Sequence, residues 1–146
     1  MVDIIKNEDL MEAIEQFYFA YRSFTAGPDR VLQERSLGRV HHRILYFVGR
    51  NPHISVNALL SVLAVSKQAL NGPLRVLVDQ GLVNTEMSTE DRRIKQLTLS
   101  PEGRKLERQL TRIQMQQLDA VFSRAGRKPM QCWLDIMREI PRVGPL

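Results

Sequence analysis

The chain has 146 residues, 43% of them hydrophobic and 25% charged, which suffices for a folded core in one domain, or in one domain with dimerisation arms. Lys and Arg outnumber Asp and Glu by 21 to 16, and this net charge of +5 favours a polyanionic partner. No apolar run reaches the roughly 18 residues of a membrane span, and the acidic start is unlike a signal peptide, so we expect a cytoplasmic protein. The single cysteine, Cys132, excludes an internal disulfide, and we expect no metal or other cofactor.

Residues 8–24 are predicted to form the first helix, because apolar side chains recur there at intervals of three and four. Asn7 is the expected N-cap, and Gly27-Pro28-Asp29 is expected to end the helical pattern. The apolar face is wide and rich in aromatic rings; its members are Leu10, Met11, Ile14, Phe17, Tyr18, Tyr21 and Phe24.

Three further helices are predicted over residues 36–49, 55–63 and 66–81 from the same periodicity. Each begins with a serine that can cap a helix N-terminus, at Ser36, Ser55 and Ser66. Gly81 supplies the residue type that most often follows the last turn of a helix.

A β-hairpin follows these helices. Residues 82–87 and 94–99 alternate in the manner of strands, and the polar segment 88–93 between them is the predicted loop. Ser100-Pro101-Glu102 then begins a long helix to about residue 124, since proline suits the first helical position. Gly126 interrupts the pattern, and a last helix is predicted from about Pro129.

The predicted order is therefore four helices, a hairpin and two helices, a mainly α fold with a small β-hairpin wing. Two short helices joined by a tight turn and followed by a basic hairpin are typical of a winged helix-turn-helix that binds double-stranded DNA. The chain then divides into an N-terminal dimerisation helix with its connector (1–35), a DNA-binding domain (36–99) and C-terminal dimerisation helices (100–146).

The terminal helices carry more apolar surface than the central part can bury, which predicts a homodimer built from both ends of the chain. Cys132 lies beside Trp133 in this region and is expected to behave as a small hydrophobe, with a redox role left open. The residues expected at the dimer interface are Leu10, Ile14, Phe17, Tyr21, Leu118, Phe122, Trp133 and Met137.

The fourth helix is the predicted recognition helix. Lys and Arg bind guanine edges or phosphates, Gln and Asn match adenine, and a glycine lets the backbone approach the duplex. The alternative for these polar residues is a solvated helix face. The residues expected to contact DNA here are Ser66, Lys67, Gln68, Asn71, Gly72 and Arg75.

Pro73 falls inside this predicted helix and removes a backbone donor there. Two geometries are open. In the first, the helix is continuous and kinked near Gly72. In the second, a shorter helix is capped by Asn71 and has Pro73 in its first turn. We favour the kinked helix, whose bend would set the docking angle on DNA.

The hairpin tip carries Arg92 and Arg93, which suit contact with phosphates or a minor groove. Asp91 is expected to hold one of these arginines or to cap the turn. On the second helix, Arg39 and Arg43 either contact phosphates as well or are plain surface residues.

The crease between the terminal helices and the DNA-binding part could accept a small aromatic or anionic effector. Tyr18, His41 and Tyr46 are the candidates for lining such a pocket, and core packing is the alternative for the tyrosines. Because His41 and His42 are adjacent, they cannot share a helix face as a metal pair. We expect one of them to point into the crease.

Taken together, these segments resemble the MarR family of bacterial transcriptional regulators over nearly the whole chain. The resemblance is carried by residues 59–68, 77–83 and 97–103 and by Asp91-Arg92-Arg93. It implies a triangular winged-helix homodimer that binds a palindromic operator, usually as a repressor released by a small aromatic anion or by oxidation. It also implies that Ser66, Lys67, Gln68, Asn71 and Arg75 face the major groove and that Asp91, Arg92 and Arg93 form the wing contact.

The chain departs from the usual family pattern at Gly72-Pro73, which affects the expected helix geometry. Cys132 lies near the opposite end of the chain from the cysteine of the oxidant-sensing branch, which argues against peroxide sensing by that route. The rival function is a winged-helix interaction module whose basic face contacts an acidic protein. No nucleophile triad, metal-ligand set or phosphate-binding glycine loop is present in the sequence, so we expect no enzyme.

Overall fold

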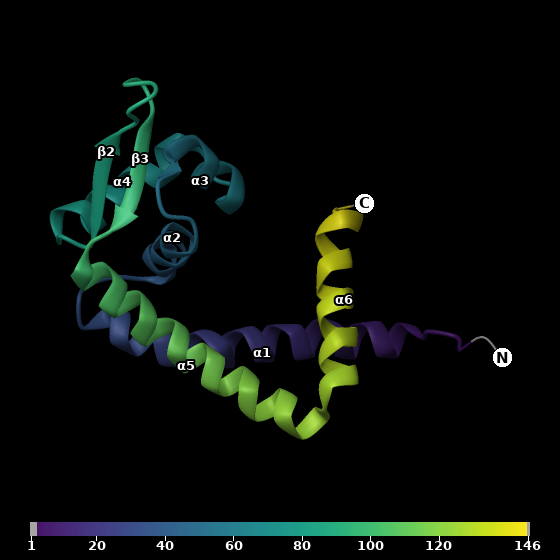
Figure 1. Ribbon diagram of the computed structural model, residues 1–146. Coiled ribbons are helices and arrows are strands. Elements are labelled where there is room, and N and C mark those ends of the chain that lie inside the picture. The colour runs from purple at the N-terminus through teal and green to yellow at the C-terminus, as the bar shows by residue number, and fades with distance from the viewer. Residues whose placement is uncertain (1–2, 146) are drawn as a thin grey trace.

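The computed structural model describes residues 3–145, and in this range it contains six helices and three strands (Figure 1). Along the chain they are α1 (Asn7–Gln33), α2 (Arg39–Arg50), β1 (Ile54–Ser55), α3 (Val56–Leu63), α4 (Lys67–Asp79), β2 (Val83–Met87), β3 (Lys95–Leu99), α5 (Pro101–Ala125) and α6 (Arg127–Val143). The mainly α fold with a β-hairpin is confirmed, and β1 is an addition to the predicted elements. None of the helices between residues 3 and 145 is long and apolar enough to cross a membrane.

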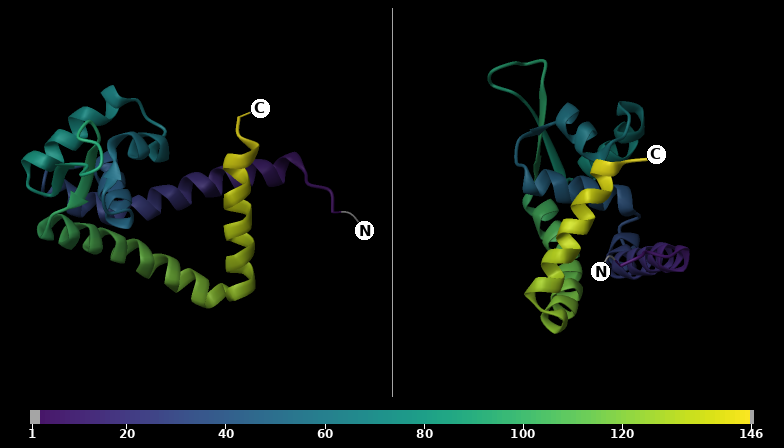
Figure 2. Two further views of the ribbon diagram at one scale, coloured as in Figure 1. Left: turned by 45° about the horizontal axis from the view of Figure 1, so that its top comes forward. Right: turned by 90° about the vertical axis from the view of Figure 1, so that its right-hand side faces the viewer.

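A lobe made of α2, α3, α4 and the sheet lies at one end of the molecule, while the start of α1 and all of α6 lie at the other (Figures 1 and 2). Helix α5 connects the two ends and packs against both α1 and α2. This arrangement separates the predicted DNA-binding elements from the predicted dimerisation arms.

Helix α1 continues through Gly27-Pro28-Asp29, so the predicted break at these residues is wrong. Pro28 has no N–H to donate to the carbonyl of Phe24, but Nε2 of Gln114 in α5 donates to that oxygen at 3.4 Å. A Cβ on Gly27 would lie only 2.7 Å from Cγ2 of Ile113, so the glycine lets α5 come close. The residues that interrupt the sequence pattern therefore mark the crossing of α1 and α5.

Two predicted N-caps are also wrong. Helix α1 already includes Asn7; the residue before it is Lys6, whose backbone N–H donates to Oδ2 of Asp9 at 2.9 Å. Ser36 lies in the turn after α1 with a φ of 56°, and α2 begins only at Arg39. Here the N–H of Gly38 donates to Nδ1 of His41 at 2.9 Å, so the imidazole binds a backbone donor at this helix start.

The predicted N-caps of the two helices in the helix-turn-helix, α3 and α4, are confirmed. The Oγ atoms of Ser55 and Ser66 accept backbone N–H groups at 3.0 Å and 3.1 Å at the starts of α3 and α4. Gly81 ends α4 with a φ of 72°. Its N–H and that of Leu82 donate back into the last turn at 2.9 Å each, the paired bonds of a Schellman ending.

Helix α4 runs unbroken through Pro73, so the shorter helix capped by Asn71 is wrong. Pro73 stands at the seventh residue of the helix and is half-buried. The kink near Gly72 stays a prediction.

The three strands form an antiparallel sheet in the order β1–β3–β2. Val83 pairs with Leu99, Thr85 with Leu97 and Met87 with Lys95. Leu97 and Leu99 are two residues apart on β3 and are both buried, so this face of the sheet packs on the helices. The core holds aliphatic side chains from every part of the lobe and from α1 and α5: Leu32, Leu37, Ile44, Leu45, Val48, Leu59, Leu70, Leu77, Leu82, Val83, Leu97, Leu99, Leu106 and Leu110.

Ser100 joins the hairpin to α5. Its Oγ donates to the carbonyl of Gly81 at 2.6 Å and accepts the N–H of Gly103 at 3.0 Å, while its own N–H donates to the carbonyl of Leu82 at 3.0 Å. Helix α5 then runs to Ala125, and Gly126, with a φ of 96°, turns the chain into α6. The last helix begins at Arg127, two residues before the predicted start.

Candidate nucleic-acid interface

The first turns of α4 present an exposed polar surface. Lys67, Gln68, Asn71 and Arg75 are all exposed, as is Gly72, where an added Cβ would meet no atom within 4 Å. Ser66 also lies on this surface, but its hydroxyl is engaged in capping the helix. A partner can therefore approach this part of α4 without displacing any packed side chain.

A groove of about 600 Å³ separates α4 from the hairpin. On one side, Lys67, Asn71 and Arg75 follow each other at intervals of four residues, which places them on one stripe of the helix. The floor is partly apolar, and every charged residue that lines the groove is basic. The lining residues are Ser55, Val56, Asn57, Lys67, Asn71, Leu74, Arg75, Val78, Thr85, Arg93, Ile94 and Lys95.

The hairpin tip is held in shape by Asp91. Its carboxylate accepts the backbone N–H of Arg93 at 3.0 Å and two guanidinium N–H groups of the same residue at 3.1 Å each. These hydrogen bonds, the side-chain one foremost, lower the pKa of Asp91. The expected roles of arginine partner and turn cap are thus both filled by one carboxylate.

Ser88 supports the same loop from the other side. It is buried, and its Oγ accepts the N–H groups of Glu90 and Asp91 at 3.2 Å and 3.4 Å. Arg92 at the tip is exposed, and it takes part in none of the ion pairs of residues 3–145. The wing therefore presents one arginine fixed by Asp91 and one that points to solvent unpaired.

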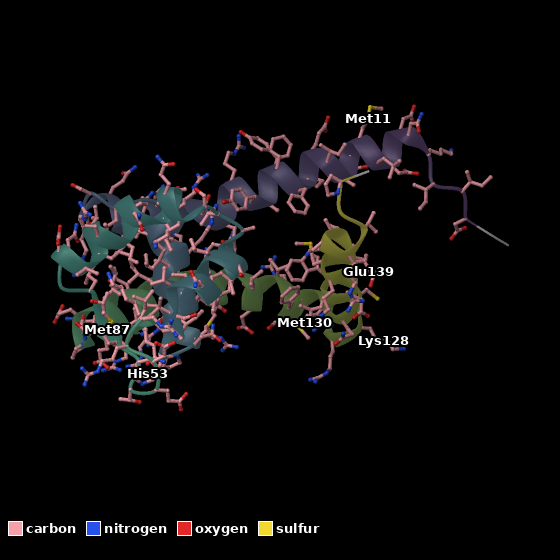
Figure 3. All side chains as sticks on the ribbon, turned by 90° about the horizontal axis from the view of Figure 1, so that it is seen from above. Met11, His53, Met87, Lys128, Met130 and Glu139 are labelled. Atoms are coloured by element: carbon pink, nitrogen blue, oxygen red, sulfur yellow. The ribbon has the colours of Figure 1, made fainter. Side chains whose placement is uncertain are left out.

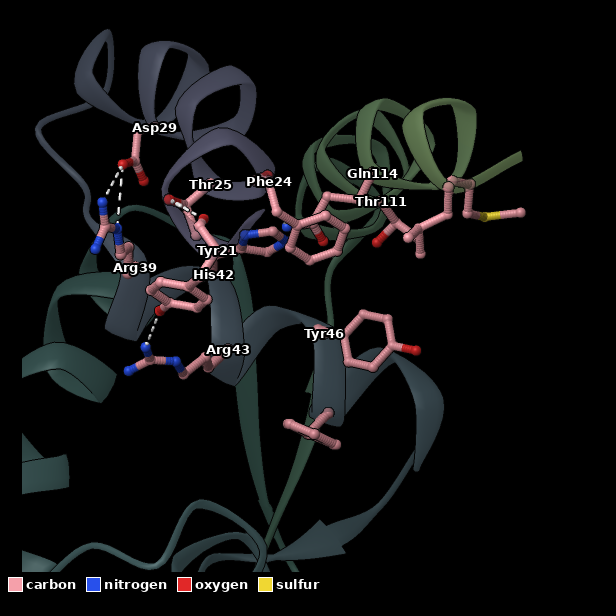
Figure 4. Close-up of a pocket in the computed structure, with 13 residues that line it drawn as sticks. Tyr21, Phe24, Thr25, Asp29, Arg39, His42, Arg43, Tyr46, Thr111 and Gln114 are labelled. Carbon is pink, nitrogen blue, oxygen red and sulfur yellow. Dashed lines mark hydrogen bonds and ion pairs between the residues drawn. The ribbon is translucent and has the colours of Figure 1, made fainter. Parts of the chain in front are cut away.

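A second cavity, of about 320 Å³, lies between the arm, here α1 with the adjoining α5, and α2 of the lobe (Figure 4). Arg39 and Arg43 line it instead of extending the surface of α4 and the wing. Nη2 of Arg39 pairs with Oδ2 of Asp29 at 3.1 Å, which raises the pKa of Arg39, and Nη2 of Arg43 donates to Oη of Tyr21 at 2.8 Å. The side chains of α1 and α2 are thus tied together across this cavity.

Of the three residues predicted for a ligand pocket, Tyr46 lines this cavity and Tyr18 and His41 do not. Tyr18 is instead an exposed residue of α1 that lies beside Phe19 and Arg22, with the guanidinium of Arg22 5.6 Å from its ring centre. His41 is turned to the start of α2 by its hydrogen bond with Gly38.

The histidine that points into the cavity is His42. Burial lowers its pKa; the nearby charge of Asp29 opposes this shift, and that of Arg43 adds to it. Burial also lowers the pKa of His41. Sequence periodicity could not choose between the two neighbours, because the cavity forms only where α1 and α5 pack against α2.

Four of the apolar residues predicted at the dimer interface are exposed on α1 and α6. Leu10 is 52% exposed, Ile14 70%, Phe17 52% and Trp133 41%. Figure 3 shows the segment of α1 around Met11 extending well away from the lobe. No residue of α6 is buried.

The remaining predicted interface residues have contacts within the chain. Phe122 packs against Trp133, with ring centres 5.4 Å apart, and Met137 of α6 is half-buried. Leu118 and Tyr21 line the cavity between arm and lobe.

Comparison with known proteins places this geometry in a family. The sequence model of the MarR family matches residues 36–94, the segment from α2 through α4 to β2 and the hairpin loop. The HTH-type transcriptional regulator PetP of Rhodobacter capsulatus is 43% identical over 122 residues, which cover 84% of this chain and 74% of PetP.

Solved structures share the fold at lower identity. FabT of Streptococcus pneumoniae in complex with DNA has a TM-score of 0.80 at 14% identity, covering 92% of this chain and 96% of FabT. MarR of Staphylococcus aureus in complex with salicylate and kanamycin has a TM-score of 0.73 at 21% identity, covering 94% and 93%. From the identity to PetP and the match of the family model, the chain belongs to the MarR family of DNA-binding transcriptional regulators.

Proposed function

We propose that the chain works in the cytoplasm as a homodimer that binds a palindromic operator and represses transcription. The observation that carries this proposal is the unobstructed cationic surface formed by the first turns of α4 and the wing. A two-fold dimer would present two such surfaces, and two recognition helices read half-sites about one helical turn, or roughly 34 Å, apart.

In this proposal, base edges are read from α4. Gln68 and Asn71 carry the amide groups that match adenine, while Lys67 and Arg75 bind guanine edges or phosphates. Gly72 leaves space for the duplex to approach the helix backbone, since an added side chain there would project into open solvent.

The wing contributes contacts of a different kind. Asp91 fixes Arg93, and Ser88 shapes the loop, so Arg92 is carried on a preformed tip. A preformed loop loses little conformational freedom on binding. We assign Arg92 and Arg93 to phosphates or to the neighbouring minor groove, where negative potential is concentrated.

The exposed apolar faces of α1 and α6 support the homodimer. Large exposed apolar patches on a folded protein mark interaction surfaces. Here the patches lie on the two arms, far from the cationic surface, so a second copy can bind them while α4 and the wing remain free.

A small aromatic anion is the proposed effector, and the cavity between arm and lobe is its proposed site. Arg43 supplies positive charge there, whereas the charge of Arg39 is paired with Asp29, and the rings of Tyr21, Phe24 and Tyr46 supply apolar surface. The Staphylococcus aureus relative binds salicylate, which has this chemistry. Because the cavity is lined by both α1 and α2, a bound ligand would change the angle between arm and lobe.

Selection of bound duplexes from a random pool tests this function. We expect enrichment of an inverted repeat, sedimentation of the free protein as a dimer, and weaker binding when salicylate is added. Binding to heparin with no binding to any duplex would favour the rival function, an interaction module for an acidic protein. Binding to duplex that is unaffected by a panel of aromatic acids would remove the effector from the proposal and leave the rest.

A further inference from the structure

The wing carries a lysine on the face where the same strand carries core leucines. Side chains two residues apart in a strand lie on the same face of the sheet. On β3 this row is Lys95, Leu97 and Leu99, and both leucines are buried against the helices. Lys95 therefore points to the side of the sheet that faces α4, just beyond the end of the core, and it lines the groove.

The groove that Lys95 enters is basic on both sides. Lys67 and Arg75 line it from α4, and Arg93 and Lys95 line it from the wing. Arg93 is neutralised by Asp91, but Lys67, Arg75 and Lys95 take part in none of the ion pairs found between residues 3 and 145. Three uncompensated cations around one groove repel each other and create a positive potential that an anion entering the groove would relieve.

The uncharged lining completes a surface suited to phosphate oxygens. Asn71 faces the groove from α4, and Ser55, Asn57 and Thr85 add hydroxyl and amide groups that can donate hydrogen bonds. Phosphate and sugar contacts in protein–DNA complexes come from this mixture of Lys, Arg, hydroxyl and amide groups. Among residues 3–145, no carboxylate lines the groove.

We propose that Lys95 binds a phosphate of the DNA strand that passes between α4 and the wing. This inference rests on the proposed function and adds a residue to it. With α4 in the major groove and the wing at the neighbouring minor groove, the strand between the two grooves lies over this cleft. Lys95, in the last strand pair before the loop of the wing, is a point charge on a flexible stem and positions the duplex without reading its sequence.

Lys95→Gln removes the charge and keeps most of the side-chain length, and Lys95→Arg restores the charge. Lys128→Gln in α6 is the matched control, because it removes one exposed lysine charge far from the groove. Each variant is titrated by fluorescence anisotropy against two labelled duplexes, one of mixed sequence and one selected from a random pool, over a series of KCl concentrations. Because Lys95 and Lys128 are both exposed, all three variants should have the melting temperature of the wild-type protein.

For Lys95→Gln, the slope of the logarithm of the association constant against log[KCl] should become less negative by about 0.9 for each bound protomer. Affinity at low salt should fall by about tenfold per protomer, equally on both duplexes, which is the loss of one charge-assisted hydrogen bond. Lys95→Arg should retain the wild-type slope, and Lys128→Gln should leave both slope and affinity unchanged.

A wild-type slope for Lys95→Gln would overturn the inference while leaving the proposed function in place. So would a loss confined to the selected duplex, because that result would make Lys95 a reader of bases. Failure of the wild-type chain to bind either duplex would instead overturn the proposed function itself, whatever the variants do.

Discussion

Replacing Gly103 by alanine should destabilise the fold at the joint between hairpin and α5. Gly103 is buried in the first turn of α5, against the backbone of Leu82. A Cβ there would overlap the carbonyl oxygen of Leu82 and lie 2.9 Å from its carbonyl carbon. The same oxygen accepts the N–H of Ser100 at 3.0 Å, so the added methyl must either displace α5 or break this hydrogen bond.

The magnitude follows from three contributions. Forcing a methyl group into a packed site costs about 1–3 kcal/mol, and a lost hydrogen bond adds about 1 kcal/mol. Alanine offsets about 1 kcal/mol through its higher helix propensity. The free energy of unfolding should therefore fall by about 1–3 kcal/mol for Gly103→Ala, which lowers the melting temperature of a chain of this size by about 3–9 °C.

Urea unfolding followed by far-UV circular dichroism measures this loss, at one protein concentration because a dimer's stability depends on concentration. Gly72→Ala is the matched control: this glycine is also helical, but a Cβ would meet nothing within 4 Å, so the variant should gain up to about 1 kcal/mol. A Gly103→Ala protein as stable as wild type, or a larger loss for Gly72→Ala, would refute the packing argument.

Three further predictions concern the DNA surface and pH. Arg92→Ala should weaken binding to the selected duplex without shifting the urea midpoint, because Arg92 is exposed at the wing tip; unchanged affinity would exclude it from the wing contact. Gln68→Ala should reduce the preference for the selected over the mixed duplex more than it weakens binding to the mixed one; an equal loss on both would remove its role in reading bases. Burial lowers the pKa of His42 below its ordinary 6.5. The neutral imidazole therefore contributes fully to the free energy of unfolding above pH 6.5. That contribution is lost as the pH falls further, because the unfolded chain then binds the proton more readily than the folded one. His42→Gln should accordingly reduce the fall in unfolding free energy below pH 6.5, leaving the part due to His41; an unaltered pH profile would contradict the assignment.

The order and type of the main elements could be predicted because periodicity and turn residues agree in most of the chain. The Ser55 and Ser66 caps, the helix start at Ser100-Pro101-Glu102 and the Gly81 ending are local signals, and the structure confirms each of them. Gly27-Pro28 misled the prediction because its effect is tertiary: the carbonyl that Pro28 leaves without a donor is satisfied by Gln114, a residue far away in the sequence.

The surface formed by α4 and the wing could be predicted further from the sequence than the cavity between arm and lobe. The residues of α4 and the wing tip lie where helix and hairpin periodicity place them. Lys95 could have been found from its alternation with Leu97 and Leu99, but its position on the groove required the fold. Arg39 and His42 line the cavity between arm and lobe, which depends on the crossing of α1 over α2 and could not be inferred from local pattern.

The most direct test of the central claim, that two copies of α4 and its wing act together on DNA, is a hydroxyl-radical footprint on a duplex selected from a random pool. We predict protection on both strands in two segments related by a two-fold axis, with centres about one helical turn, or roughly 34 Å, apart. A single protected segment without this symmetry, or no protection at concentrations where the protein sediments as a dimer, would contradict the account.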